Sequence, residues 1–238
     1  MSKKHSINEP VRFVTATALF DGHDASINIM RRILQDSGAE VIHLGHNRSV
    51  SDIVNAAVQE GVQGIAVSSY QGGHMEFFKY LIDLLKKKGC EYIKVFGGGG
   101  GVIVPDEIKE LEAYGVSKIF SPDDGKAMGL KGMISYMIEK ASQVNPPEVA
   151  MDIRTIRAKD PVSMGRLISR AERARFFKDK SFEPMQAFLQ ANACSTPIVG
   201  ITGTGGSGKS SLIDELLRRM LYSFPDKRIA VISVDATR

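Results

Sequence analysis

Asp21 and His23 are the first pair of residues in this sequence whose types and spacing could do chemistry. They follow a β-rich run, at a position where side chains of a parallel sheet point towards any ligand bound at the sheet edge. One imidazole nitrogen can bind a transition metal while the other donates to a carboxylate, which Asp21 could supply. Taken alone, the pair is more typical of a surface histidine beside a helix-capping acid.

Two later segments strengthen the metal-ligand interpretation. Ser68–His74 follows the third β-rich run of the chain, and Gly97–Gly101 follows the fourth. Glycines remove side chains where a bulky ligand must approach the backbone, and serine hydroxyls can bond a heterocycle nitrogen. The glycine run could instead be a mobile loop, but its place between a buried strand and a helix favours close packing.

A phosphate-binding pattern forms the third group of candidate residues. Backbone N–H groups of such a loop bind phosphate oxygens, Lys209 reaches the terminal phosphates, and the Ser210 hydroxyl contacts magnesium. The alternative is a glycine-rich turn. Asp235, after the next β-rich run, could hold magnesium through water or act only as a helix cap, and both interpretations remain open. The candidates for the nucleotide site are Gly203, Gly205, Gly206, Ser207, Gly208, Lys209 and Ser210.

Alternating β-rich and amphipathic runs from Val11 to about Gln143 must position the first two groups. This alternation predicts an α/β fold, a flavodoxin-like doubly wound five-stranded parallel sheet of order 2-1-3-4-5, with ligands beyond the carboxyl ends of its strands. The expected strands are Val11–Leu19, Glu40–Leu44, Gly64–Ser68, Tyr92–Phe96 and Lys118–Phe120. The expected helices lie near Ser26–Ser37, Val50–Glu60, His74–Lys88, Pro105–Tyr114 and Gly125–Ser142.

Asn145-Pro146-Pro147 interrupts helical continuation, because proline lacks an N–H donor and restricts the residue before it. We therefore expect a first domain over 1–145, a helical linker over 146–195 and the truncated start of a P-loop nucleotide-binding α/β domain over 196–238. The linker is basic, but it lacks interleaved aromatic residues for base stacking, so a solvated or partner-facing helix is favoured over a nucleic-acid surface. The elements expected in the last part are a strand at Ile198–Gly200, a helix at Ser210–Leu221 and a strand at Arg228–Val234.

Composition argues against several classes of partner. The formal net charge of +4 is small for 238 residues, so it gives no reason to expect a nucleic acid or an anionic membrane. No run is apolar for the length of a membrane span, and the polar start lacks the pattern of a signal peptide. The two cysteines, Cys90 and Cys194, have no ligand-like spacing and fit a reducing compartment. We expect a soluble, cytoplasmic protein.

The segments DGHDAS, VSSYQGGH and FGGGGGVIVPDE resemble the cobalamin-binding domain of adenosylcobalamin-dependent acyl-CoA mutases. The resemblance covers nearly all of Val11–Gln143. It implies that His23 replaces the dimethylbenzimidazole base of the cofactor as the lower ligand of cobalt and that Asp21 orients His23. It also implies that the displaced tail enters the domain. The residues that it assigns to the tail are Ser68 as a contact, with Gly98 and Gly99 as the wall of the pocket.

Two positions depart from the pattern of that family. Ser26 stands where the family has glycine, and Tyr70 stands where it often has leucine. Both belong to the expected cofactor site, and the departures concern the shape of the tail pocket more than cobalt ligation. His74 matches a recurrent histidine after the third strand, for which we expect a structural or interface role.

The segments IRAKDPVSMGRLISRAE, PIVGITGTGGSGKSSLIDEL and IAVISVDAT resemble the GTPase chaperones that load and protect cobalamin mutases. A cobalamin domain followed by such a GTPase resembles the acyl-CoA mutases that are fused to their chaperone, in which a substrate-binding barrel follows. For the complete enzyme, this resemblance implies cobalt–carbon homolysis and a carbon-skeleton rearrangement between isobutyryl- and n-butyryl-CoA. We expect no catalytic residue within the 238 residues of this sequence.

The same resemblance implies the cofactors and partners of the complete protein. These are adenosylcobalamin, a guanine nucleotide with Mg²⁺, an acyl-CoA bound through a barrel outside this sequence, and further copies of the chain. No guanine-reading Asn-Lys-x-Asp occurs in the sequence, so guanine over adenine depends on the resemblance. Two alternatives stay open at this point: a methyl-carrying corrinoid protein, and a nucleotide-dependent switch or metallochaperone that binds no corrin.

Overall fold

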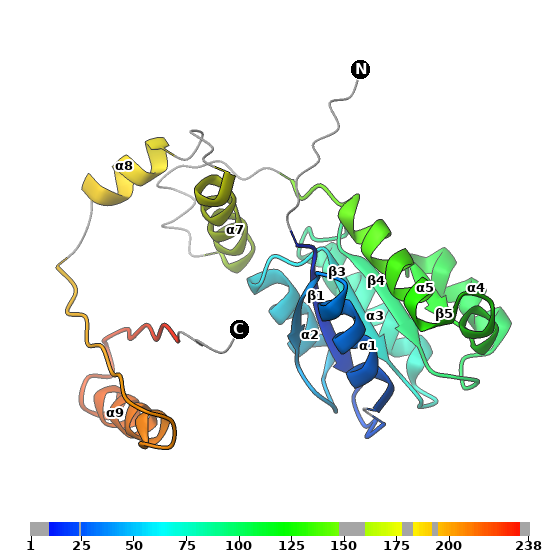
Figure 1. Ribbon diagram of the computed structural model, residues 1–238, viewed down its shortest axis with the longest axis horizontal. Coiled ribbons are helices and arrows are strands. Elements are labelled where there is room, and N and C mark those ends of the chain that lie inside the picture. Colours follow the sequence, from blue (N-terminus) through cyan, green and yellow to red (C-terminus); the bar gives the residue numbers. More distant parts are fainter. Residues whose placement is uncertain (1–9, 24, 148–159, 178–182, 192–194, 234–238) are drawn as a thin grey trace. The chain divides into compact units, whose positions relative to one another are not determined.

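The computed structural model contains a five-stranded parallel sheet of order β2-β1-β3-β4-β5 (Figure 1), which confirms the expected flavodoxin-like order. The strands are β1 (Arg12–Thr17), β2 (Glu40–His43), β3 (Gly64–Ser68), β4 (Lys94–Gly98) and β5 (Lys118–Phe120). The structure describes residues 10–23, 25–147, 160–177, 183–191 and 195–233. Contacts divide the chain into two units, Met1–Phe188 and Leu189–Arg238.

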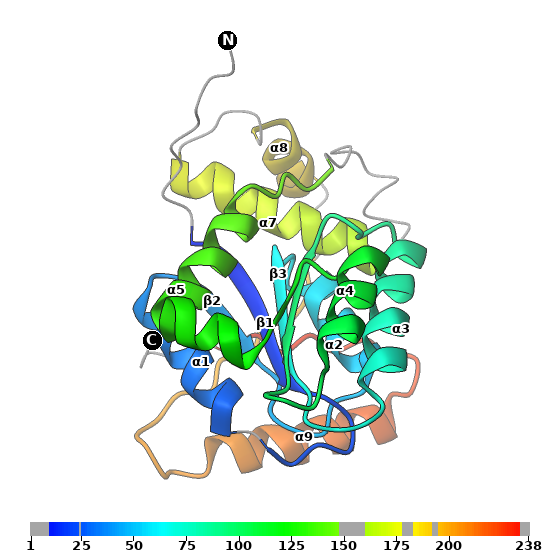
Figure 2. The same cartoon turned by 90° about the vertical axis from the view of Figure 1, so that its right-hand side faces the viewer.

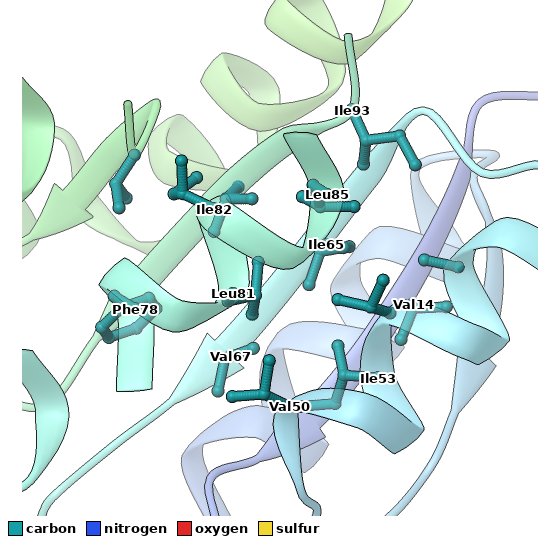
Figure 3. Close-up of a cluster of buried hydrophobic side chains, with 14 of the residues drawn as sticks. Val14, Val50, Ile53, Ile65, Val67, Phe78, Leu81, Ile82, Leu85 and Ile93 are labelled. Carbon is teal, nitrogen blue, oxygen red and sulfur yellow. The ribbon is translucent and has the colours of Figure 1, made fainter. Parts of the chain in front are cut away.

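Helices cover both faces of the sheet, as the alternating pattern requires (Figure 2). Phe13, Ala66 and Phe96 point to the layer formed by α1 and α5. Residues of the opposite parity, such as Ile65 and Val67, pack with α2, α3 and α4 in the larger cluster (Figure 3). The helices are α1 (Ala25–Asp36), α2 (Val50–Gln59), α3 (His74–Lys87), α4 (Pro105–Tyr114) and α5 (Pro122–Ser142).

The strand register aligns the residues at the carboxyl edge of the sheet. Thr17 pairs with Ser68, Ser68 with Gly98, and Gly98 with Phe120. Because parallel strands end at the same edge, the loops that follow β1, β3 and β4 meet there. The register therefore brings together the first two groups of candidate residues.

The largest differences from the expected bounds are in the fourth strand and the fifth helix. The fourth strand begins at Lys94 rather than Tyr92 and continues to Gly98, so that the glycine run starts inside the sheet. A side chain at Gly97 would place its Cβ 2.4 Å from Phe78, so glycine is what lets the strand continue beneath that ring. The fifth helix begins at Pro122, because Ser121 and Asp124 form a capping box, and it kinks at Gly129 (φ 65°).

The helix α7 (Pro161–Phe177) packs against α2 within the first unit. A Cβ at Gly165 would lie 2.6 Å from the Val58 carbonyl oxygen, which shows how closely the two helices approach. Arg166 donates to the Gly89 carbonyl oxygen at 3.0 Å, and its guanidinium lies 5.2 Å from the centroid of the Tyr92 ring. The division into 1–145, 146–195 and 196–238 stays a prediction, with α7 and α8 (Glu183–Ala191) as helices of the linker.

In the second unit the helix is confirmed and the strands are not. α9 spans Lys209–Ser223, close to the expected Ser210–Leu221. Residues 198–200 and 228–233 form no strand, and Val234 lies outside the described residues. Ile198 and Val199 are 94% and 81% exposed. A parallel strand needs neighbours to complete its hydrogen bonds, and neither segment pairs with a strand among the described residues.

Candidate functional site

Asp21 and His23 form a hydrogen-bonded pair in the loop after β1. The Nδ1 atom of His23 lies 2.9 Å from Oδ1 of Asp21, and the His23 backbone N–H donates to the same oxygen at 2.9 Å. The carboxylate is fully buried, whereas the imidazole is 77% exposed. A carboxylate only accepts, so Nδ1 carries the proton, and Nε2 of the neutral ring keeps a free lone pair. This is the arrangement of a metal-binding histidine with its orienting carboxylate.

The Asp21 carboxylate also joins two loops. Its Oδ2 atom accepts a hydrogen bond of 2.5 Å from the backbone N–H of Tyr70, in the loop after β3. Burial by itself raises the pKa of Asp21, but the hydrogen bonds from Tyr70 and His23 outweigh burial, and the pKa lies below its ordinary value. Asp21 is therefore an ionised acceptor at neutral pH.

Beside this pair, a cavity of about 310 Å³ opens between the sheet edge and the helices α1 and α5. We call it the α1–α5 cavity. Its volume is at the lower end of the range for small-molecule pockets. Five of the cofactor-site candidates line it: Ser26, Ser68, Tyr70, Gly98 and Gly99. The structure thus places the candidates for the tail contact on one cavity and the candidates for cobalt ligation next to it.

Gly98 and Gly99 contribute to the cavity in different ways. A Cβ at Gly98 would lie 3.5 Å from the Phe120 carbonyl oxygen and 4.0 Å from Phe120 Cβ, both ordinary contacts, so the missing side chain leaves space in the cavity. A Cβ at Gly99 would lie 1.9 Å from the Ser69 carbonyl oxygen, which is not possible without a backbone shift. Gly99 therefore lets the loops after β3 and β4 touch, and the Ser69 N–H bonds the Gly98 carbonyl oxygen at 2.8 Å.

The hydroxyl groups of the site are paired inside the protein. Ser68 is buried and donates to Thr17 Oγ1 at 3.3 Å. Tyr70 donates through its hydroxyl to Ser26 Oγ at 3.2 Å. The two departures from the family pattern, at positions 26 and 70, are therefore in contact with each other.

Most of the remaining cavity wall is apolar, and sequence reasoning missed it. Ala66 and Phe96 precede Ser68 and Gly98 by two positions, so the period of a strand places them on the same face. This two-residue period could have been used to predict the part of the apolar wall that comes from the strands. The apolar residues contributed by helices are Ile27, Ile29 and Met30 of α1, and Pro122, Leu130, Met133 and Met137 of α5.

Phe20 is a second feature that was not predicted. It has a left-handed backbone (φ 65°), its side chain is 77% exposed, and its N–H donates to Asn47 Oδ1 at 2.8 Å. Asn47 is also left-handed (φ 57°), and these two are the only such non-glycine residues in the described part of the chain. Strained backbone of this kind clusters at functional sites. Here it immediately precedes Asp21.

His74 has a structural role in this geometry. The side chain is buried, with Nδ1 at 2.8 Å from the Gln71 carbonyl oxygen and Nε2 at 2.9 Å from Glu107 Oε2. It thereby ties the start of α3 to the start of α4.

The phosphate-loop candidates lie together at the start of α9. Gly206 and Gly208 are left-handed (φ 75° and 81°), and the helix begins at Lys209. The Lys209 ammonium donates to the Thr204 carbonyl oxygen at 2.6 Å, and Ser207 donates to the same oxygen at 2.9 Å. Gly203, Gly205 and Ser210 complete this loop and the first turn. Asp235 lies outside the described residues.

Two family models match the chain. The B12 binding domain matches residues 11–127, and the methylmalonyl-CoA mutase-associated GTPase MeaB matches residues 164–238. The first range contains the Asp21–His23 pair and most of the residues that line the α1–α5 cavity, and the second contains the phosphate loop. The alternative that binds no corrin is not favoured by the first match.

Curated relatives name the wider family. The 2-hydroxyisobutanoyl-CoA mutase small subunit of Aquincola tertiaricarbonis is 32% identical, with 48% of this chain and 82% of the subunit covered. The chain belongs to the B12-binding acyl-CoA mutase family. Within that family, the fused isobutyryl-CoA mutase of Geobacillus kaustophilus is 57% identical over 96% of this chain and 21% of its own length. The fused enzyme of Cupriavidus metallidurans is also 57% identical, over the same shares.

This member of the B12-binding acyl-CoA mutase family matches the amino-terminal portion of the fused isobutyryl-CoA mutases and spans about a fifth of their length. It combines a B12-binding domain with a stretch of the MeaB GTPase family, as the order of motifs indicated. No helix among the described residues has the length and apolar character needed to cross a membrane.

Proposed function

We propose that this chain binds adenosylcobalamin with its nucleotide tail detached from cobalt and with His23 as the lower ligand. The observation that carries the proposal is the Asp21–His23 pair. Its ring nitrogen Nδ1 is held at 2.9 Å by a buried carboxylate, while the rest of the ring faces outwards. Cobalt in a corrin already has four ring nitrogens, so a single protein ligand is sufficient.

The residues present fit the cofactor. A corrinoid bound to His23 must place its displaced tail somewhere, and the α1–α5 cavity begins beside that residue. Gly98 leaves space in the cavity wall, and the apolar lining from α1 and α5 suits an aromatic base. Ser26, Ser68 and Tyr70 supply hydroxyl groups for the polar atoms of the tail.

The residues of the site have different tasks in this proposal. Adenosylcobalamin supplies radicals by homolysis of its cobalt–carbon bond, and the protein binds and orients the cofactor. Asp21 fixes the tautomer and the orientation of the His23 ring. Gly99 keeps the loops after β3 and β4 together, so that the cavity and the histidine stay adjacent.

For the complete protein we propose the activity of the fused relatives. That activity is the isomerisation of isobutyryl-CoA to n-butyryl-CoA, with the acyl-CoA bound through a barrel domain and with the protein assembled from several copies. The phosphate loop would bind GTP, with Lys209 at the terminal phosphates and with Ser210 and Asp235 at Mg²⁺. The match to the MeaB family supports this proposal over a methyl-carrying corrinoid protein.

The proposal is tested by titrating the chain with adenosylcobalamin and following the absorbance change that accompanies loss of the intramolecular base. We expect the parent chain to give the spectrum of a corrinoid without its own base. His23→Ala should abolish or strongly weaken binding. His46→Ala removes another exposed histidine at the same sheet edge and should bind as the parent does. Equal binding by both variants would contradict the proposal.

A further inference from the structure

Tyr70 is held over the α1–α5 cavity by contacts on four sides. Its N–H donates to Asp21, and its ring centroid lies 5.6 Å from that of His23. Its hydroxyl donates to Ser26 Oγ at 3.2 Å. On the remaining side, a Cβ at Gly100 would lie 3.1 Å from Tyr70 Cε1, so the absence of a side chain there makes room for the ring.

These contacts place the Tyr70 ring between the proposed metal ligand and the cavity. Ser26 belongs to the first turn of α1 and Gly100 to the loop after β4, and both line the cavity together with Tyr70. The ring therefore forms the part of the cavity wall that adjoins His23. Because Tyr70 contacts both His23 and the cavity, a tail attached to a corrin on His23 would enter the cavity beside this ring.

We propose that the Tyr70–Ser26 hydroxyl pair is a latch, which narrows the α1–α5 cavity on the side of His23 before cofactor binding and opens to admit the tail. This inference rests on the proposed function. The glycine and leucine that are usual at these two positions have no hydroxyl groups, so the latch depends on both departures at once. It gives Tyr70 and Ser26 a role in the kinetics of cofactor loading.

The strength of the pair suits a latch. One neutral hydrogen bond changes an equilibrium by about two- to tenfold, which is small enough for the ring to open spontaneously. When only a fraction of molecules is open, the apparent association rate falls by that fraction. Removing either hydroxyl should therefore raise the association rate by up to the two- to tenfold factor by which the hydrogen bond shifts the equilibrium.

The test measures association rates by stopped-flow absorbance with two corrinoids in excess. Adenosylcobalamin carries the tail, whereas adenosylcobinamide lacks it and does not need the cavity. For Tyr70→Phe and for Ser26→Ala, we expect adenosylcobalamin to associate about two- to tenfold faster than with the parent, while adenosylcobinamide is unaffected. The double variant should be no faster than the faster single variant, because both changes open one latch.

Tyr114→Phe is the matched control. It removes a hydroxyl that donates to Asp83 at 2.9 Å, between α3 and α4 and away from the cavity, and it should change neither rate. Without cofactor, backbone amides at the start of α1 should exchange hydrogen faster in Tyr70→Phe and Ser26→Ala than in the parent or in Tyr114→Phe. This second readout does not depend on cofactor chemistry.

Several results would overturn the latch. They are unchanged or slower adenosylcobalamin association in both variants, independent effects that multiply in the double variant, or equal acceleration of adenosylcobinamide. A different result would contradict the proposed function: the parent chain itself would not bind adenosylcobalamin in the form whose base is detached from cobalt. A parent that binds in that form, at the same rate as its variants, refutes the latch alone.

Discussion

The Nδ1 atom of His23 lies 2.9 Å from Oδ1 of Asp21, and the aspartate is buried while the histidine is exposed. In the proposed complex, His23 contacts the ligand, and Asp21 holds the His23 ring in place. For Asp21→Ala we expect adenosylcobalamin binding to weaken by roughly 10- to 100-fold, as losses of orienting carboxylates do, while the His23 nitrogen stays on cobalt. Equilibrium titration measures the affinity. Asp36→Ala, an exposed aspartate at the end of α1, is the control and should bind as the parent does.

Gly98→Leu should fill the α1–α5 cavity without disturbing the fold, because a Cβ at this position meets only ordinary contacts. We expect affinity for adenosylcobalamin to fall on the order of 100-fold, since a tail forced against a filled pocket suffers a strong overpacking penalty. Adenosylcobinamide should bind with unchanged affinity. Gly101→Leu projects into open space outside the cavity and serves as the control. Equal binding of adenosylcobalamin by both variants would show that the tail lies elsewhere.

Asp124 should make the free energy of unfolding depend on pH. Burial raises its pKa, but hydrogen bonds from Ser121 and the charge of Lys118 outweigh burial and lower the pKa overall. A lowered pKa stabilises the fold above the unfolded value of about 3.9, and this stability is lost as pH falls through the folded pKa. Asp124→Asn replaces hydrogen bonds to a charged acceptor with hydrogen bonds to a neutral one, and it should therefore cost about 1 kcal/mol at pH 7. The difference from the parent should shrink towards zero below about pH 4. Urea unfolding between pH 7 and pH 3 measures both values, and a constant difference would contradict this account.

The 238-residue chain is expected not to hydrolyse GTP. The segments that flank its phosphate loop form no strands among the described residues, and Ile198 is 94% exposed, so the sheet that would support the loop is not assembled. Release of inorganic phosphate from GTP measures this activity. Turnover that Lys209→Ala abolishes would show that the nucleotide site is more complete than we infer.

Much of the first unit could be predicted from the sequence. The alternation of β-rich and amphipathic runs was sufficient for the strand order, because parallel strands connected by helices have few allowed arrangements. The bounds of the fourth strand were harder to predict from the sequence. Gly97 and Gly98 are typical of a loop, and only the packing of Phe78 over Gly97 shows that the strand continues through them.

The site was predictable where a motif is local in the sequence and not where helices meet. Asp21 and His23 lie two positions apart, and their pairing follows from that spacing and one turn. The Tyr70–Ser26 hydrogen bond joins residues 44 positions apart and depends on where α1 sits over the sheet. The prediction of strands around the phosphate loop was wrong for a related reason. Residues with high β-propensity do not form a strand unless neighbouring strands complete their hydrogen bonds.

The central claim is that the His23 nitrogen bonds cobalt. Electron paramagnetic resonance of cob(II)alamin bound to protein labelled with ¹⁵N-histidine tests it most directly, because the unpaired electron couples to the nitrogen of the lower ligand. We expect hyperfine coupling to a protein ¹⁵N in the parent chain, the same coupling in Asp21→Ala and in His46→Ala, and none in His23→Ala. Unchanged coupling in His23→Ala would contradict the claim.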